Sequence, residues 1–222
     1  MFTEMLETRG NETVRLRVRE AASFHLESRG PVVGGALRGV LGIDPSLAST
    51  GFCLMTPENI GGSSILVRLW TAGANLKKGA TAWEKQARLH LLAEHAAVSW
   101  GTGAQHVGME GAVFAKFAAN DLGELRGVMK EKLMFGCSPP PEVHLVAPLS
   151  ARKTLLGRGT KGKGPVGAYL KARWGVDLPG TDMDDAFAVA NHVWAKVNGW
   201  GYGPTQQELD GLAKALGNGR KS

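Results

Sequence analysis

Short apolar segments separated by turn residues fill the middle of the chain. Residues 39–44, 50–55 and 64–70 follow one another closely and are separated by turns rich in proline, serine and asparagine. This spacing predicts three strands in an antiparallel meander. Residues 106–110 and 143–146 have the same apolar character and predict a fourth and a fifth strand, each reached through a helical segment.

Helical periodicity appears between and after these strands. Apolar residues recur three and four positions apart in residues 81–100 and 118–135, which predicts two long helices. Further helices are expected at 148–156, 165–174 and 181–197. The order β-β-β-α-β-α-β-α predicts an α/β fold with a mixed five-stranded sheet, in which an antiparallel meander is joined to two parallel strands and flanked by helices.

The two ends of the chain differ from this middle part. Residues 1–37 contain a stretch in which Val14, Leu16 and Val18 alternate with arginines, as in a strand, and residues 20–27 fit either a strand or a short helix. We therefore expect an N-terminal arm or extension at 1–37 and one α/β domain at 38–198. The tail at 199–222 is expected to contain a short helix, opened by a capping-box pattern.

The composition narrows the class of protein. The 222 residues are 43% hydrophobic, enough for one sizeable core, and the formal net charge is +6. A basic balance favours a polyanionic partner such as nucleic acid. Cys53 and Cys137 lie in no ligand spacing and are expected to be thiols in a reducing compartment. With no long apolar run and no secretory signal, we expect a protein of the cytoplasm with no membrane partner.

Carboxylates occupy unusual places in this pattern. Asp44 and Glu110 each end an apolar strand, and Asp182 and Asp185 fall on one face of the first turn of the last helix. Carboxylates that converge away from water repel one another unless a cation is bound. Oxygen-only ligands suit Mg²⁺ or Mn²⁺, and two such ions in one site can hydrolyse a phosphodiester. The sequence therefore predicts a nuclease with two metal ions per active site.

Each acidic residue also has a simpler interpretation. Asp44 precedes Pro45 and fits a turn. Asp182 and Asp184 both fit the positive end of the helix dipole, and Asp184 competes with Asp182 for the place beside Asp185. The prediction of a metal site rests on the set in its order along the chain, and the choice between Asp182 and Asp184 stays open.

A basic, glycine-rich segment precedes the last helix. Its cationic residues include Arg152, Lys153, Arg158, Lys161 and Lys163. Glycines between them would let phosphates approach the backbone closely, which indicates a phosphate-binding loop; the alternative is a solvated loop without a ligand. The six histidines show no spacing typical of metal ligands, and we expect none of them in a metal site.

Several short blocks together resemble one known family. Residues 41–46 with 50–52, 108–110 with 114–116 and 123–127, 154–157, and 182–190 are similar in order and spacing to blocks of the RuvC-type Holliday-junction resolvases, of the RNase H-like superfamily. The resemblance runs from about residue 38 to residue 197. It implies a homodimeric hydrolase of DNA recombination and repair, which resolves four-way junctions in branched DNA by paired symmetric nicks.

The resemblance also assigns roles to residues. It implies that the four carboxylates hold the metals, that Lys163 acts at the scissile phosphate with Arg152 or Lys153, and that Phe114 probes the opened junction. Lys116 would contact DNA beside it. The spacing from Glu110 to Phe114 is one residue longer than the family's, and that from Lys116 to Arg126 is shorter, which fits a divergent, phage-encoded member in an infected bacterial host.

Other functions remain open on the same residues. A nuclease for forks, flaps or RNA–DNA hybrids would use the same carboxylates, and a non-catalytic junction-binding protein would not need them. Actin-like ATPases also begin with a strand that ends in aspartate, but their duplicated domain does not fit in 222 residues.

Overall fold

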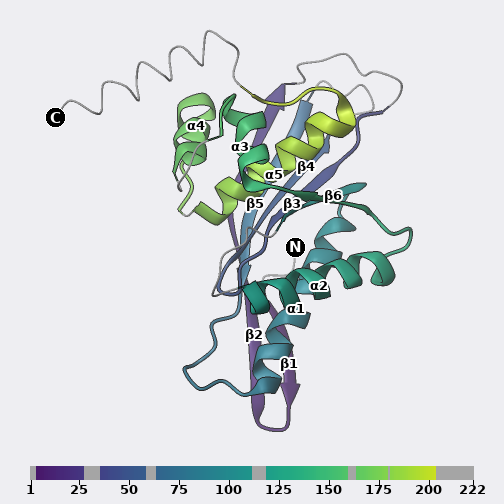
Figure 1. The fold of residues 1–222 in the computed structure, drawn as a ribbon, viewed down its shortest axis with the longest axis vertical. Helices are drawn as coiled ribbons and strands as arrows, with labels where there is room; N and C mark the ends of the chain where they lie inside the picture. Colours follow the sequence, from purple (N-terminus) through teal and green to yellow (C-terminus); the bar gives the residue numbers. More distant parts are fainter. Residues whose placement is uncertain are drawn as a thin grey trace, which may run out of the picture.

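A single mixed sheet runs through the computed structural model, which describes residues 4–27, 36–58, 64–111, 119–159, 164–179 and 181–203. Its seven strands lie in the order β1-β2-β5-β4-β3-β6-β7 (Figure 1). The strands are β1 (Glu4–Arg9), β2 (Glu12–Glu27), β3 (Val40–Asp44), β4 (Thr50–Pro57), β5 (Ser64–Gly73), β6 (His106–Glu110) and β7 (Glu142–Val146). The helices are α1 (Ala82–Trp100), α2 (Ala119–Gly136), α3 (Pro148–Leu156), α4 (Pro165–Trp174) and α5 (Thr181–Asn198).

The predicted α/β class is confirmed, and one detail of it is wrong. Strands β3, β4 and β5 form the antiparallel meander, and β3, β6 and β7 run parallel, as the pattern predicted. The sheet has seven strands rather than five, because residues 4–27 form a hairpin that pairs with β5. Residues 20–27 are therefore strand and not helix, since hydrogen bonding to β5 overrides their local ambiguity.

Strand β2 contributes to two hydrophobic cores, one on each face of the sheet. Val14 and Leu16 are buried in the core under α1, whereas Leu26 is buried with Phe24 packed beside it in the core under α5. These residues all have even numbers, so a regular strand would place them on one face. A bulge between Glu20 and Ala22 shifts the register and turns the second half of the strand over.

Helices cover both faces of the sheet. Helix α5 lies across β3, β4 and β6, with α3 and α4 beside it, and α1 and α2 cover the other face (Figure 1). The approach of α5 is very close, because a Cβ atom added to Gly42 would lie 2.4 Å from the Ala186 carbonyl oxygen. At Gly51 the corresponding distance, to the Asp182 carbonyl oxygen, is 2.0 Å. Glycine at these positions lets the first turns of α5 rest on the strand backbones.

None of the described helices is both long and apolar enough to cross a lipid bilayer. Cys53 is buried and Cys137 half-buried, and both are free thiols.

Candidate metal centre

Three of the predicted carboxylates converge at the carboxyl ends of two neighbouring parallel strands. Asp44 ends β3, Glu110 ends the neighbouring parallel strand β6, and Asp185 projects from α5. One carboxylate oxygen from each lies within 4.8 Å of the other two. Parallel strands end at the same edge, and α5 is held against that edge by the glycines beneath it. The fold thus brings together Asp44 and Glu110, which are 66 positions apart, and Glu110 and Asp185, which are 75 positions apart.

Burial and mutual repulsion make this cluster unfavourable when it is fully ionised. Burial, and then the charge of Glu110, raises the pKa of Asp44 to about 9. Asp44 and Glu110 share a hydrogen bond, and the charges of Asp185 and Asp182 raise the pKa of Asp44 further. Burial also raises the pKa of Glu110, although the bond to Asp44 and nearby arginines oppose the change. Without a cation, this pair holds a proton at neutral pH.

Arginines neutralise part of the cluster. The Arg152 guanidinium, on α3, donates to both oxygens of Asp185, with Nε–Oδ1 at 3.0 Å and Nη2–Oδ2 at 2.9 Å. Both side chains are nearly buried. On α2, Arg126 Nε donates to the backbone oxygen of Glu110 at 3.0 Å. Of the described arginines, only Arg152 pairs with a carboxylate of the cluster, so two arginines beside three carboxylates leave the cluster short of positive charge.

The two remaining aspartates of α5 point in different directions. Asp182 is not one of the three residues whose oxygens converge, although its charge is felt at Asp44. Asp184 is buried against α4, where it accepts a hydrogen bond from the Gly167 backbone N–H. Burial, with the charge of Asp185, raises the pKa of Asp184 to about 7. A Cβ atom at Gly167 would lie 2.6 Å from Asp184 Oδ2, so this glycine makes room for the contact.

The donor set fits a divalent cation with a preference for oxygen. The three converging side chains are all carboxylates, which are ligands suited to Mg²⁺ and Mn²⁺. The raised pKa of Asp44 indicates the same need for positive charge. A cation here would remove both the repulsion and the shared proton.

The basic residues predicted from the sequence are only partly described. Lys153 on α3 and Arg158 just after it are exposed, whereas Arg152 is bound to Asp185. Four further predicted residues, Phe114, Lys116, Lys161 and Lys163, lie outside the described residues. Their places relative to the carboxylates stay predictions.

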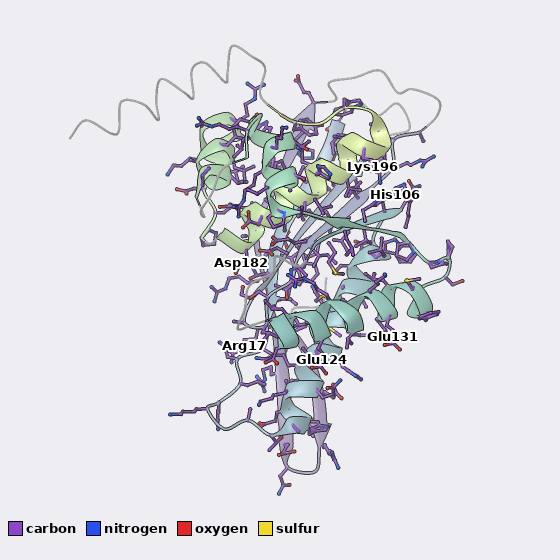
Figure 2. The ribbon with its side chains drawn as sticks, viewed as in Figure 1. Arg17, His106, Glu124, Glu131, Asp182 and Lys196 are labelled. Carbon is purple, nitrogen blue, oxygen red and sulfur yellow. The ribbon has the colours of Figure 1, made fainter. Side chains whose placement is uncertain are left out.

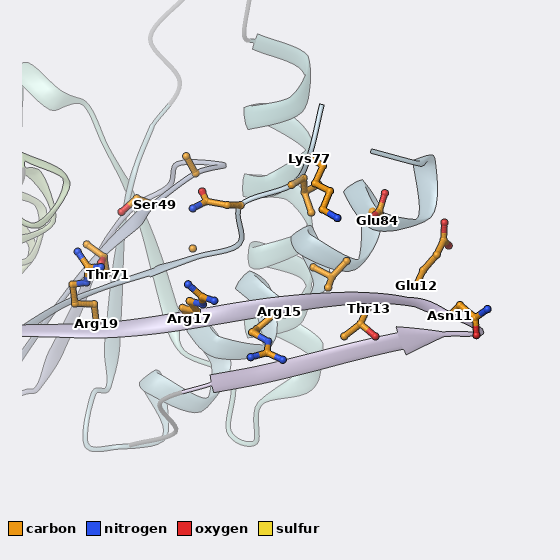
Figure 3. A pocket seen from close by; sticks show the side chains of 15 residues that line it. Asn11, Glu12, Thr13, Arg15, Arg17, Arg19, Ser49, Thr71, Lys77 and Glu84 are labelled. Atoms are coloured by element: carbon orange, nitrogen blue, oxygen red, sulfur yellow. The ribbon is translucent and has the colours of Figure 1, made fainter. Parts of the chain in front are cut away.

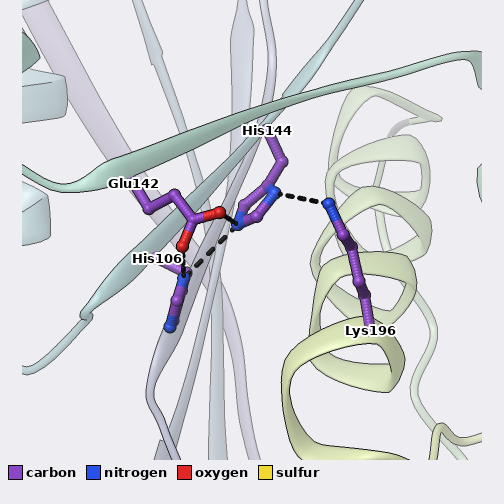
Figure 4. Close-up of polar contacts among 4 residues, drawn as sticks. All are labelled: His106, Glu142, His144 and Lys196. Carbon is purple, nitrogen blue, oxygen red and sulfur yellow. Dashed lines mark hydrogen bonds and ion pairs between the residues drawn. The ribbon is translucent and has the colours of Figure 1, made fainter.

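A second group of potential ligands lies near the amino ends of β6 and β7, and the sequence analysis missed it. His106 Nδ1 lies 3.4 Å from Glu142 Oε2, and His144 Nε2 lies 3.5 Å from Glu142 Oε1 (Figure 4). Lys196 Nζ, from α5, is 3.2 Å from His144 Nδ1. The histidines show no ligand spacing in the sequence, and the fold nevertheless brings two of them together with Glu142. The available signal was that His106 and Glu142 begin two consecutive parallel strands, with His144 two residues after Glu142.

Comparison with known proteins gives one kind of match. No protein-family model matches the chain, and no curated protein matches it. A solved structure of Thermus thermophilus RuvC superposes with a TM-score of 0.56 at 18% sequence identity, covering 73% of this chain and 98% of that one. The chain has a RuvC-like fold. A T. thermophilus RuvC in complex with a Holliday junction substrate matches with a TM-score of 0.53 at 15% identity, covering 72% of this chain and 94% of that one. Nearly all of the RuvC chain thus has a counterpart here, and this chain has additional residues.

Proposed function

We propose that the protein is a divalent-metal-dependent endonuclease that cuts branched DNA and resolves four-way junctions by paired symmetric nicks. The observation that carries this proposal is the convergence of Asp44, Glu110 and Asp185 within 4.8 Å on a RuvC-like fold. The solved RuvC complex with a Holliday junction supports the choice of DNA substrate.

In this proposal Asp44, Glu110 and Asp185 hold Mg²⁺ or Mn²⁺, with Asp182 beside them. Two bound ions would activate a water molecule and stabilise the leaving 3′ oxygen of a phosphodiester. Asp44 and Glu110 must release their shared proton for binding, because a protonated carboxyl is a poor ligand. Arg152 holds Asp185 in place from the opposite side through its paired hydrogen bonds.

The basic residues after α3 supply phosphate contacts in this proposal. Lys153, Arg158, Lys161 and Lys163 bind the backbone of the cleaved strand, and Lys163 acts at the scissile phosphate. Phe114 and Lys116 contact the opened centre of the junction. A homodimer, with one site per subunit, matches the twofold symmetry of a four-way junction and would place one nick on each of two strands.

A junction-cleavage assay tests the proposal. Purified protein is incubated with a labelled immobile junction, and with matched duplex and fork substrates, in Mg²⁺, in Mn²⁺ and in EDTA. We expect paired symmetric nicks on the junction, and none in EDTA or with Asp44→Asn. Equal cutting of forks or duplex would replace the junction resolvase with a broader structure-specific nuclease. Tight junction binding without any cleavage would instead favour the non-catalytic junction-binding protein.

A further inference from the structure

Three arginines form a row on one face of strand β2. Arg15, Arg17 and Arg19 alternate with apolar residues that face α1, and all three are exposed. Together with Lys77 they line a pocket of about 760 Å³, to which Ser49 of the turn between β3 and β4 also belongs (Figure 3). The pocket therefore adjoins the turn that follows the metal-site residue of β3.

The arginine row lies on the same face of the sheet as the carboxylates. Directly opposite residues of antiparallel strands share a face. Asp44 is opposite Gly51, Gly51 is opposite Thr71, and Thr71 is opposite Arg19. This line crosses three strand spacings, about 14 Å at roughly 4.8 Å each. From Arg19 the row follows β2 toward the hairpin tip for about 14 Å more, four residues at roughly 3.4 Å each.

Two of the arginines form no ion pair. Across the described segments of the chain, neither Arg17 nor Arg19 pairs with a carboxylate; Glu4, which is opposite Arg17 in the β1–β2 register, pairs with Arg15 at 3.2 Å. Like charges two residues apart on one strand repel one another, and a bound polyanion would relieve that repulsion.

The acidic residues of the pocket do not neutralise this row. Glu12 and Glu84 line the pocket near the hairpin tip, away from Arg19 (Figure 3). Glu84 is already engaged in the capping box of α1, where its carboxylate accepts the Thr81 backbone N–H at 2.7 Å.

Protection of a sheet edge does not explain Arg17. Charged residues often prevent an edge strand from pairing with another molecule. Strand β2 pairs with β1 along Glu12–Arg17 and with β5 along Arg17–Glu27. Among the described residues Arg17 therefore has a partner strand on each side, whereas Arg15 and Arg19 each have one. The charge of Arg17 serves the exposed face of the strand and not its edge.

We propose that Arg17 and Arg19, with Arg15 and Lys77, bind the sugar–phosphate backbone of a duplex DNA arm that extends from the metal centre. The inference rests on the proposed function, because it takes DNA as the ligand of the carboxylate site. It adds a binding surface, the arginine track, in the N-terminal hairpin that precedes the residues resembling RuvC. The first turn of α5 rests on Gly51 along this line, so the arm would pass over that turn. It would meet the track after about 14 Å, roughly four base pairs at 3.4 Å each.

The salt dependence of binding tests the arginine track. Affinity for a labelled four-way junction is measured in EDTA, between 50 and 200 mM salt, with Asp44→Asn as the parent. The variant Arg17→Ala/Arg19→Ala is compared with Lys85→Ala/Lys130→Ala, which removes the same charge from exposed positions on α1 and α2. A third variant, Arg17→Lys/Arg19→Lys, keeps the charge.

We expect the double arginine variant to bind about 10- to 30-fold more weakly, and its log–log salt slope to fall by about 1.8, since each lost phosphate contact contributes about 0.9. The lysine variant should keep the parental slope. Affinity and slope equal to those of the Lys85/Lys130 control would overturn the track. If the wild type binds junctions but cuts none, the nuclease proposal fails, and the salt slope of the double arginine variant alone decides on the arginine track. If the parent binds no DNA, both fail.

Discussion

Strand β6 carries a cluster of potential metal ligands at each end. At its carboxyl end Glu110 meets Asp44 and Asp185, and at its amino end His106 meets Glu142 and His144. Helix α5 spans both clusters, with Asp182 near the first and Lys196 near the second (Figure 2). The same two elements thus support two sites built from different donors.

The two clusters differ in how their charge is balanced. The carboxylate cluster contains three acids, one arginine bound to Asp185, and a proton shared between Asp44 and Glu110. In the histidine cluster, burial lowers the pKa of both imidazoles, so they are neutral at neutral pH. An exposed carboxylate and an ammonium complete it.

This difference in charge balance shows that ligand atoms lying close together do not by themselves define a metal site. Lys196 Nζ lies beside Nδ1 of His144, and an ammonium can only donate. Nε2 of His144 then carries the ring proton and is not available as a ligand. The histidine cluster is satisfied by its own groups, whereas the carboxylate cluster lacks positive charge.

The largest expected effect comes from removing one carboxylate at each end of the sheet. Asp44→Asn should lower junction cleavage at least ~10³-fold, because it removes a metal ligand. The matched change Glu142→Gln, also from carboxylate to amide, should leave cleavage within about 3-fold, the scatter expected for a group outside the reaction. Initial rates on the labelled junction compare the two. A similar loss in both variants would refute the contrast between the clusters.

The position of α5 offers a second way to separate the clusters. Gly51→Ala places a methyl group against the Asp182 carbonyl oxygen and should displace the first turn of α5. We expect a loss of about 1–3 kcal/mol in the free energy of unfolding and ~10²-fold slower cleavage. Gly123→Ala on α2 is the control, because a Cβ atom there meets nothing within 4 Å. Gly123→Ala should stabilise the protein by about 0.5–1 kcal/mol. Full activity of Gly51→Ala would contradict the close approach of α5 to β4.

The pH dependence of the metal-free protein gives a third and smaller effect. The pKa of Asp44 is about 9 in the folded protein and lies above its unfolded value. Its contribution to stability is thus complete below the unfolded pKa and is lost as the pH rises through about 9. In EDTA, stability should fall between pH 7 and 9, and Asp44 alone should contribute at most about 1.4 kcal/mol per pH unit to this fall.

Cation binding should reverse this trend. Mn²⁺ or Mg²⁺ at 100 times its Kd should stabilise the protein by about 2.7 kcal/mol, with the larger shift in Tm at pH 9. Thermal unfolding measures both effects. Asp44→Asn should lose the part of the pH slope that Asp44 contributes and most of the metal shift, while Asp184, whose pKa is raised to about 7, keeps its own contribution. A flat profile in the wild type would mean that Asp44 is ionised without metal.

The contrast also separates what the sequence could predict from what it could not. Asp44 and Glu110 end apolar segments, so their place at one edge of a parallel pair followed from local pattern alone. The partners of His106 depend on the register between β6 and β7, in which His106 is opposite Glu142 and Gly108 is opposite His144. That register is fixed by packing between distant segments.

The N-terminal hairpin was difficult to predict for a related reason. Between residues 14 and 26 the even positions are apolar except for Glu20, which predicts a strand with one buried face. The bulge at Glu20–Ala22 redirects half of them into a different core. Glu20 interrupts the apolar alternation at that point, but only the pairing with β5 shows that the strand turns over there.

The smallest effect concerns the histidine cluster alone. The charge of Glu142 raises the pKa of both His106 and His144, against the larger effect of burial. Glu142→Gln should therefore lower both imidazole pKa values further, which NMR titration of the ring protons measures. Stability at pH 7 should change by less than about 1 kcal/mol, because Glu142 is largely exposed. Zn²⁺ that raises the Tm of the wild type but not of Glu142→Gln would show that the histidines bind metal, and charge balance would then no longer distinguish the two ends of β6.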